Sequence, residues 1–168
     1  VWDNKSEDGG LLIGRNFDFY ANDDFAKNKI ISFVKPNSGY PYMSVTWGGM
    51  IGVSSGMNLE GLTVTINAGK SSIPLKAKTP ISLVALEVLQ YASTIDEAVE
   101  IAKTKKVFVS ESMMIGSAKD HRVVLIEISP KKFGVYEVQN QPYLACTNHF
   151  QSDVYLDDKR NNTQKEES

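Results

Sequence analysis

Short apolar segments separated by glycine-rich or polar turns fill the first 70 residues of the chain. We expect strands over 11–17, 29–35, 42–47, 50–58 and 62–69. In the last of these, the apolar positions from Leu62 to Ile66 fall on one face and the polar positions from Thr63 to Asn67 on the other. Because no helical pattern interrupts these segments, they predict an antiparallel sheet.

The middle of the chain has a period of 3.6 residues instead. Thr79 and Pro80 are typical of the cap and first residue of a helix, and an apolar stripe follows from Ile81 to Ala92. A capping box over 94–97 opens a second predicted helix, whose lysine-rich end suits the helix dipole. The sequence therefore predicts two helices in succession.

Strand patterns then return, and a polar tail closes the chain. We expect strands over 112–118, 122–129, 132–138 and 143–150, and we expect the tail over 157–168 to be mobile. Strands, a helical pair and further strands predict an α+β fold with helices on one face of antiparallel sheet, and two packed sheets would accommodate the number of strands.

Composition narrows the classes of function. The chain has 168 residues, enough for one domain, and its 42% apolar and 23% charged residues are ordinary for a globular protein. A formal net charge of -2 gives no basic field, so we expect no nucleic-acid partner. No apolar run approaches the roughly 18 residues that span a bilayer. With a single cysteine and two histidines far apart, we expect neither a metal nor a cofactor.

Two charged residues, Arg15 and Asp18, lie near the end of the first predicted strand. On a strand, Arg15 shares a face with Phe17, while Asp18 falls on the opposite face. Burying either group without a partner is costly. They therefore form either a strand end, with both side chains solvated or paired with lysine, or part of a functional site.

Three residues near other strand ends leave similar alternatives open. Asn67 precedes Ala-Gly, a pattern typical of a turn, but its amide also suits an oxyanion hole, and Asn148 raises the same question. Cys146 lies near His149 and resembles a nucleophile–base pair, yet it follows an apolar run. A small buried thiol is the interpretation that we favour for Cys146.

Three segments together carry a family resemblance. GRNFDF (14–19), GMNLEGLTVTIN (56–67) and LACTNHF (144–150) occur in the order found in the choloylglycine hydrolase-like N-terminal nucleophile (Ntn) hydrolases. These include bile salt hydrolases and penicillin V acylases, and the NHF motif is most similar to the isopenicillin-N acyltransferase-like, or C45 peptidase, branch. The resemblance implies a single αββα four-layer domain with mainly antiparallel sheets over 1–168, truncated at both ends.

The resemblance also implies a reaction. An N-terminal Cys exposed by autoproteolysis attacks the carbonyl of a linear amide, and its own α-amine, with a pKa of about 7.7–8.0, takes the thiol proton. The substrate is a small-molecule amide or acyl donor, and the enzyme is a hydrolase or an acyltransferase. Family members are often dimers or tetramers, and both cytoplasmic and exported forms exist, so homo-oligomerisation is an option and no compartment is favoured.

Four residues match catalytic positions of that family. Asp18 matches the Asp that holds the α-amine, and Arg15 matches the Arg beside the nucleophile. Asn67 matches the Asn of the oxyanion hole, and Asn148 matches a second catalytic Asn. We expect all four around one cleft, with the two charges paired with each other and with the nucleophile.

The nucleophile itself falls ahead of Val1 in this pattern, and Cys146 lies in the wrong segment to replace it. We therefore expect residues 1–168 alone to be inactive as an amidase. Arg160 is a weak match to a further Arg of the family. Two alternatives stay open, a catalytically inactive relative that binds a ligand or partner and an α+β interaction module without an active site.

Apolar residues of the early segments have two interpretations. They either line a pocket for an aromatic or aliphatic acyl group or belong to ordinary core packing. The residues are Phe17, Phe19, Tyr20, Phe25, Met50 and Met57.

Overall fold

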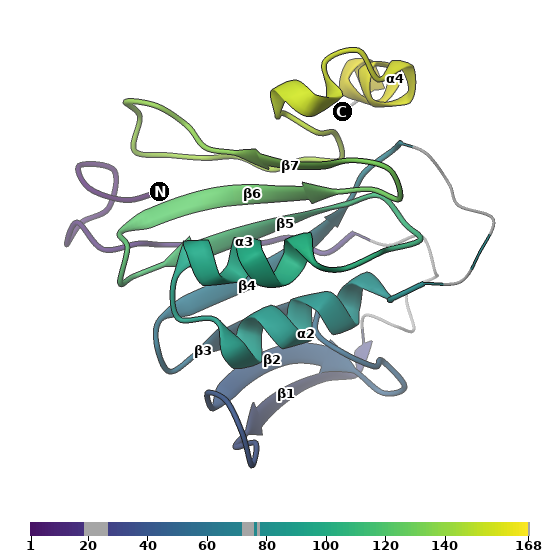
Figure 1. Cartoon of the computed structure of the whole chain (residues 1–168). Coiled ribbons are helices and arrows are strands. Elements are labelled where there is room, and N and C mark those ends of the chain that lie inside the picture. Colours follow the sequence, from purple (N-terminus) through teal and green to yellow (C-terminus); the bar gives the residue numbers. More distant parts are fainter. Residues whose placement is uncertain (19–26, 72–75, 77, 168) are drawn as a thin grey trace.

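A computed structural model describes residues 1–18, 27–71, 76 and 78–167. Its named strands form one seven-stranded antiparallel sheet whose spatial order follows the chain (Figure 1). The strands are β1 (Lys29–Val34), β2 (Tyr42–Trp47), β3 (Ser55–Asn58), β4 (Leu62–Ala68), β5 (Glu111–Ser117), β6 (Arg122–Ile128) and β7 (Phe133–Tyr136). The α+β class predicted from the sequence is confirmed. The described residues provide one sheet and the helical layer on it, and all their named strands belong to this sheet.

Two helices, α2 (Ile81–Tyr91) and α3 (Ile95–Lys103), cover one face of the sheet (Figure 1). Their apolar stripes pack on the even-numbered positions of β4, so that Leu62 and Val64 are fully buried. The Thr94 hydroxyl accepts a hydrogen bond from the Glu97 amide at 3.3 Å, which confirms the predicted cap of α3. None of the described helices is long and apolar enough to cross a membrane.

Asn58 joins the β3–β4 hairpin to the end of α2. Its amide nitrogen donates to the carbonyls of Leu89 and Ala92 at 2.9 and 2.8 Å. Its amide oxygen accepts from the backbone amides of Glu60 and Leu62, each at 3.0 Å. One buried side chain therefore provides hydrogen-bond partners for two backbone amides of a tight turn and for two carbonyls at a helix end.

The first predicted strand, 11–17, is extended but is not part of the sheet. Leu12 exchanges two backbone hydrogen bonds with Val1, at 2.9 and 3.0 Å. A strand needs a ladder of such bonds along its length, and one exchanged pair does not provide it. The predicted alternation is nevertheless present, because Arg15 lies on the half-buried side and Asp18 on the exposed side.

This N-terminal segment covers the face of the sheet away from α2 and α3 (Figure 1). Leu11 and Ile13 pack against β5 at Gly116, where a Cβ atom would come within 2.5 Å of Ile13. The glycine therefore permits the close approach of the segment to the sheet.

The last predicted strand, 143–150, is also irregular. Side chains hold its end instead of a ladder, since the buried Asn161 exchanges two hydrogen bonds with the backbone of Phe150, at 2.6 and 3.0 Å. The strand prediction was wrong here because the apolar alternation reports burial on one side, which an extended loop on a sheet also produces.

The polar tail is helical rather than mobile. It forms α4 (Lys159–Glu167), preceded by a short 3₁₀ turn, η1 (Asp153–Tyr155). The Asp158 carboxylate accepts from the amides of Arg160 and Asn161 at 3.1 and 3.3 Å, which caps the helix. The helix has no apolar stripe, and capping and one buried asparagine fix it in place. Hydrophobic periodicity could not predict it for that reason.

Candidate active site

The C-terminal end of β4 carries the first site residue, Asn67. It pairs with Ser112 of β5 inside the sheet, so the turn interpretation of this residue is wrong. Because strand side chains alternate, Asn67 lies on the face opposite Leu62 and Val64, away from the helices. Its amide therefore faces the layer formed by the N-terminal segment.

Arg15 binds the main chain immediately beside Asn67. Its guanidinium donates to the carbonyls of Ser54, at 3.1 Å, and of Ile66, and to the Ser55 hydroxyl. It also lies 4.4 Å from the centre of the Phe17 ring. Burial lowers the pKa of Arg15 from its usual value, although an arginine stays charged in proteins. Its Nε atom is buried and has no hydrogen-bond partner among the described residues.

Asn148 binds the other side of the same strand end. Its Nδ2 donates to the Ala68 carbonyl at 3.0 Å. Arg15 and Asn148 thus bind the carbonyls of the two residues on either side of Asn67, Ile66 and Ala68. Two side chains that lie far apart in sequence therefore bind β4 on either side of Asn67.

Asp18 lies at the exposed rim of this group. Arg15 and Asp18 do not form the expected ion pair: none of the ion pairs among the described residues links them. The guanidinium of Arg15 is bound to main-chain carbonyls instead. The carboxylate of Asp18 is therefore not held by the arginine beside it.

All four predicted residues line one cavity of about 600 Å³, which we call the site cavity. It lies between β4, β5 and the two extended segments. A smaller cavity of about 270 Å³, the aromatic cavity, is lined by the same four residues and by Phe17, Trp47, Met50 and Ile66. The arrangement places two amides, a guanidinium and a carboxylate around one space, while their catalytic roles stay predictions.

The apolar side of the aromatic cavity includes part of the predicted acyl lining. Phe17 packs on Trp47 with ring centres 5.2 Å apart, and Met50 lies beside them in the lining. Met57 is 44% exposed on β3 and does not line this cavity. The other residues of that prediction lie outside the described ones: Phe19, Tyr20 and Phe25.

Cys146 lines the site cavity but does not have the properties of a nucleophile. Burial raises the pKa of its thiol to about 12, so the thiol is protonated near neutral pH. Within the described part of the chain, no group of three His, Cys, Asp or Glu side chains is placed to hold a metal ion.

Glu111 belongs to the site and was missed in the sequence. It opens β5 opposite Ala68 and lines the aromatic cavity. Burial raises the pKa of its carboxyl to about 7, although the positive charge of Arg15 opposes the shift. A glutamate at the start of a strand looks solvent-exposed in sequence, and only the sheet register brings it to the site.

Glu127 supports the loop that carries Asn148. It is fully buried on β6, where its carboxylate accepts from the amides of Gln151 and Ser152 and from the Ser152 hydroxyl. The sequence signal was a charged residue inside the apolar run VVLIEI. A buried carboxylate needs such donors, so this residue fixes the backbone just after segment 143–150.

Arg160, the weak match to a further family arginine, lines neither of these two cavities. It lies on the first turn of α4, and its Nη1 donates to the Ser71 carbonyl at 3.0 Å.

Comparison with known proteins gives a family match and similar solved structures. The family profile described as acyl-coenzyme A:6-aminopenicillanic acid acyl-transferase matches residues 2–168. The Caenorhabditis elegans ortholog of N-acylethanolamine-hydrolyzing acid amidase superposes with a TM-score of 0.70 at 24% identity, over 92% of this chain and 71% of that one. Penicillin V acylase from Agrobacterium tumefaciens superposes with a TM-score of 0.48 at 23% identity, over 62% of this chain and 35% of that one.

One sequence relative is much longer than this chain. An uncharacterized protein of Archaeoglobus fulgidus is 28% identical over 141 residues. The match covers 79% of this chain and 23% of the relative.

Proposed function

The chain belongs to the acyl-coenzyme A:6-aminopenicillanic acid acyl-transferase family, and we propose that it forms the catalytic core of an enzyme acting on linear amides. The likeness to the acid amidase shows a shared fold, and the Ntn-hydrolase resemblance found in the sequence is confirmed. In this proposal the enzyme cleaves the amide C–N bond and passes the acyl group to water or to another acceptor.

The observation that carries the proposal is the convergence at the end of β4. Arg15 and Asn148 bind the carbonyls of residues 66 and 68, and Asn67 lies between them. This leaves the Asn67 amide at the cavity wall, where it suits a carbonyl oxygen that becomes negatively charged in the transition state.

The proposed nucleophile is the thiol of an N-terminal Cys ahead of Val1, and the pairing of Val1 supports this position. Val1 and Leu12 run antiparallel, so a residue two positions before Val1 would lie across from Gly14, next to Arg15. A nucleophile there would share the site cavity with the four predicted residues.

The proposed reaction has two steps. The α-amine takes the thiol proton, the sulfur attacks the amide carbon, and the Asn67 amide donates to the resulting oxyanion. The nitrogen leaves with a proton from the ammonium group, and a thioester remains. Water or an amine then attacks the thioester and restores the thiol. Asp18 is assigned to hold the ammonium group, and Asn148 to position the strand end.

The test is the identity of the mature N-terminus and the activity that depends on it. The full-length gene product is purified from its own cell, its intact mass and N-terminal sequence are determined, and amine release from a panel of N-acyl amides is measured. A mature chain that begins with Cys a few residues before Val1 and releases amine supports the proposal.

Two outcomes would contradict the proposal. A mature N-terminus without a nucleophile favours the alternative of an inactive relative that binds a ligand or partner. Acyl hydrolysis by residues 1–168 alone, retained through repurification, would contradict the assignment of the nucleophile to a position ahead of Val1.

A further inference from the structure

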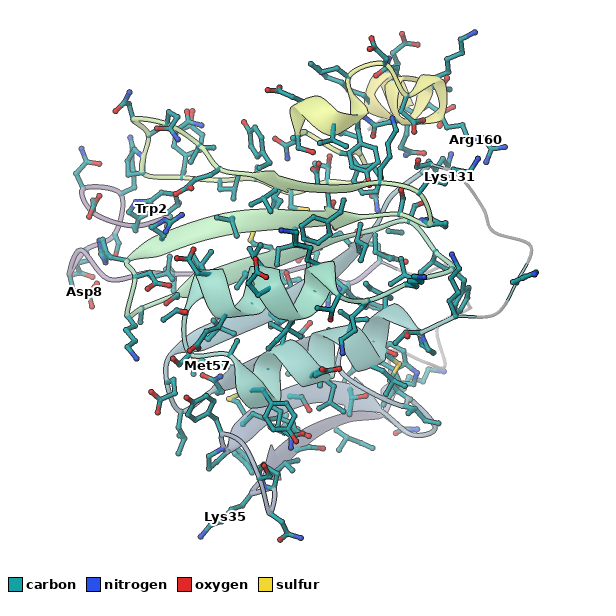
Figure 2. All side chains as sticks on the ribbon, in the orientation of Figure 1. Trp2, Asp8, Lys35, Met57, Lys131 and Arg160 are labelled. Carbon is teal, nitrogen blue, oxygen red and sulfur yellow. The ribbon has the colours of Figure 1, made fainter. Side chains whose placement is uncertain are left out.

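A third cavity of about 730 Å³ lies beside the proposed active site and has no role in the reaction above. It is formed by the end of β4, the start of β5 and the first turn of α4, and we call it the α4 cavity. Figure 2 shows Arg160 at this first turn, on the opposite side of the molecule from Trp2.

The α4 cavity carries an excess of positive charge. Lys70, Lys159 and Arg160 line it, against the single carboxyl of Glu111. Lys70 is paired with Glu167 at 3.4 Å. Arg160 uses one N–H on a backbone carbonyl, and Lys159 forms no ion pair within the described part of the chain. Two cationic groups are therefore available to a ligand.

The rest of the lining is largely apolar. Phe108 and Val109 lead into β5, and on the other side Ala68 ends β4 and Gly69 follows it. A cavity with apolar walls and cationic groups at one side suits a ligand with a hydrocarbon body and a negatively charged end.

The α4 cavity and the aromatic cavity meet at the same two residues. Ala68 and Glu111 line both. The Ala68 carbonyl is also the acceptor for Asn148, so the shared wall is part of the proposed site. The α4 cavity is therefore a direct neighbour of the proposed site.

We propose that the α4 cavity binds a hydrocarbon chain that ends in a carboxylate. We propose further that it is the subsite for such a group of the amide substrate. Binding of the carboxylate stands on the cavity itself, and only its assignment to the substrate rests on the proposed function. The recognising groups are the Lys159 ammonium and the remaining N–H groups of Arg160.

Glu111 makes this binding depend on pH. Its pKa of about 7 leaves it neutral below that pH and negative above it. The negative form repels a carboxylate in the same cavity, so affinity falls as pH rises through 7. The charged groups that line the two cavities on either side of Glu111 are Arg15, Asp18, Lys70, Lys159 and Arg160.

The experiment is titration calorimetry of decanoate into the full-length gene product at pH 6 and pH 8. We expect Lys159→Gln to weaken decanoate binding about three- to tenfold at pH 6, the size of one lost hydrogen bond at an exposed side chain. Lys165→Gln makes the same charge change on α4 but does not line the cavity, and we expect it to bind decanoate as the wild type does. We expect Glu111→Gln to bind at pH 8 as tightly as the wild type binds at pH 6.

Equal decanoate affinity in Lys159→Gln and Lys165→Gln would overturn the proposal. So would equal weakening of decyltrimethylammonium, because a cationic amphiphile gains nothing from Lys159. The substrate assignment is tested separately by the KM of a carboxylate-bearing N-acyl amide, which should rise in Lys159→Gln. Decanoate binding without amidase activity would leave the cavity proposal standing while the proposed function fails. Amidase activity with the same KM in Lys159→Gln and the wild type would refute the substrate assignment while the proposed function stands.

Discussion

At the scale of single residues, the site is organised by bonds to the main chain rather than by ion pairs. Arg15 and Asn148 each donate to a carbonyl at the end of β4, and Asn67 lies between these carbonyls. Such bonds fix the side chains before any substrate arrives, which is what electrostatic stabilisation of a transition state requires.

Replacing Asn67 removes the proposed donor to the oxyanion. In the mature full-length enzyme we expect Asn67→Ala to lower kcat about 10²–10³-fold, the usual effect of losing one such donor, with KM little changed. The measurement is steady-state amine release. Asn37→Ala, on an exposed turn, is the matched control, and full activity of Asn67→Ala would contradict the assignment.

Glu127 offers a second prediction at this scale. Glu127→Gln replaces one carboxylate oxygen by an NH₂ group, which cannot accept the hydrogen bonds that the Ser152 amide and hydroxyl donate. We therefore expect the free energy of unfolding to fall by about 1.5–3 kcal/mol. Urea unfolding measures this change. Glu137→Gln on a partly exposed pair with Arg122 should cost less than about 1 kcal/mol, and equal losses would contradict the role assigned to Glu127.

At the scale of elements, α4 stabilises the chain that follows β4. Asp158 caps the helix and also accepts from the Ser71 hydroxyl at 2.7 Å, while Arg160 donates to the Ser71 carbonyl. One helix without an apolar stripe therefore holds the segment that leaves the end of β4.

Asp158 makes this docking sensitive to acid. Burial raises its pKa, but hydrogen bonds from Ser71, Asn161 and Arg160 outweigh burial, so its pKa lies below the usual value. A carboxyl group whose pKa is lower in the folded state stabilises the fold at pH values above its unfolded-state pKa. This stabilisation is lost as pH falls through the folded-state pKa. We expect Asp158→Ala to cost about 0.5–2 kcal/mol in urea unfolding at pH 7 and less as pH falls below about 4.

The exposed neighbour provides the control for this variant. Asp157→Ala removes the same charge one residue earlier, and we expect it to change stability by no more than about 0.5 kcal/mol. A cost for Asp158→Ala that stays constant from pH 7 to pH 3 would contradict the assigned carboxylate role.

At the scale of the whole molecule, the two faces of the sheet have different roles. One face packs on α2 and α3 and forms the apolar core, while the other faces the N-terminal segment and the site cavity. Glu111 lies where the strand ends meet these two regions, so its charge affects both stability and the site.

The stability of the fold should therefore depend on Glu111 near neutral pH. Its folded pKa of about 7 lies above the usual 4.5, so the folded state binds more protons between these values and stability falls as pH rises. As pH rises from 5 to 8, we expect the free energy of unfolding of Glu111→Gln to increase by on the order of 1–3 kcal/mol relative to that of the wild type. Urea unfolding at both pH values measures the difference, and parallel pH profiles would contradict it.

Local pattern alone determined the α+β class, the two central helices and which residues of β4 face the core. Side-chain period and capping are properties of neighbouring residues, so they can be read along the chain. The likeness of three segments to a known family also singled out Arg15, Asp18, Asn67 and Asn148, and the family itself is confirmed.

Tertiary structure decided what depends on distant partners. Segments 11–18 and 143–150 alternate like strands, but only the presence or absence of a hydrogen-bonded neighbour makes a strand. Helix α4 depends on a buried Asn161, and Glu111 reaches the site through the β4–β5 register. Burial and pairing of polar groups are set by contacts between residues far apart in sequence, and hydrophobic periodicity does not encode them.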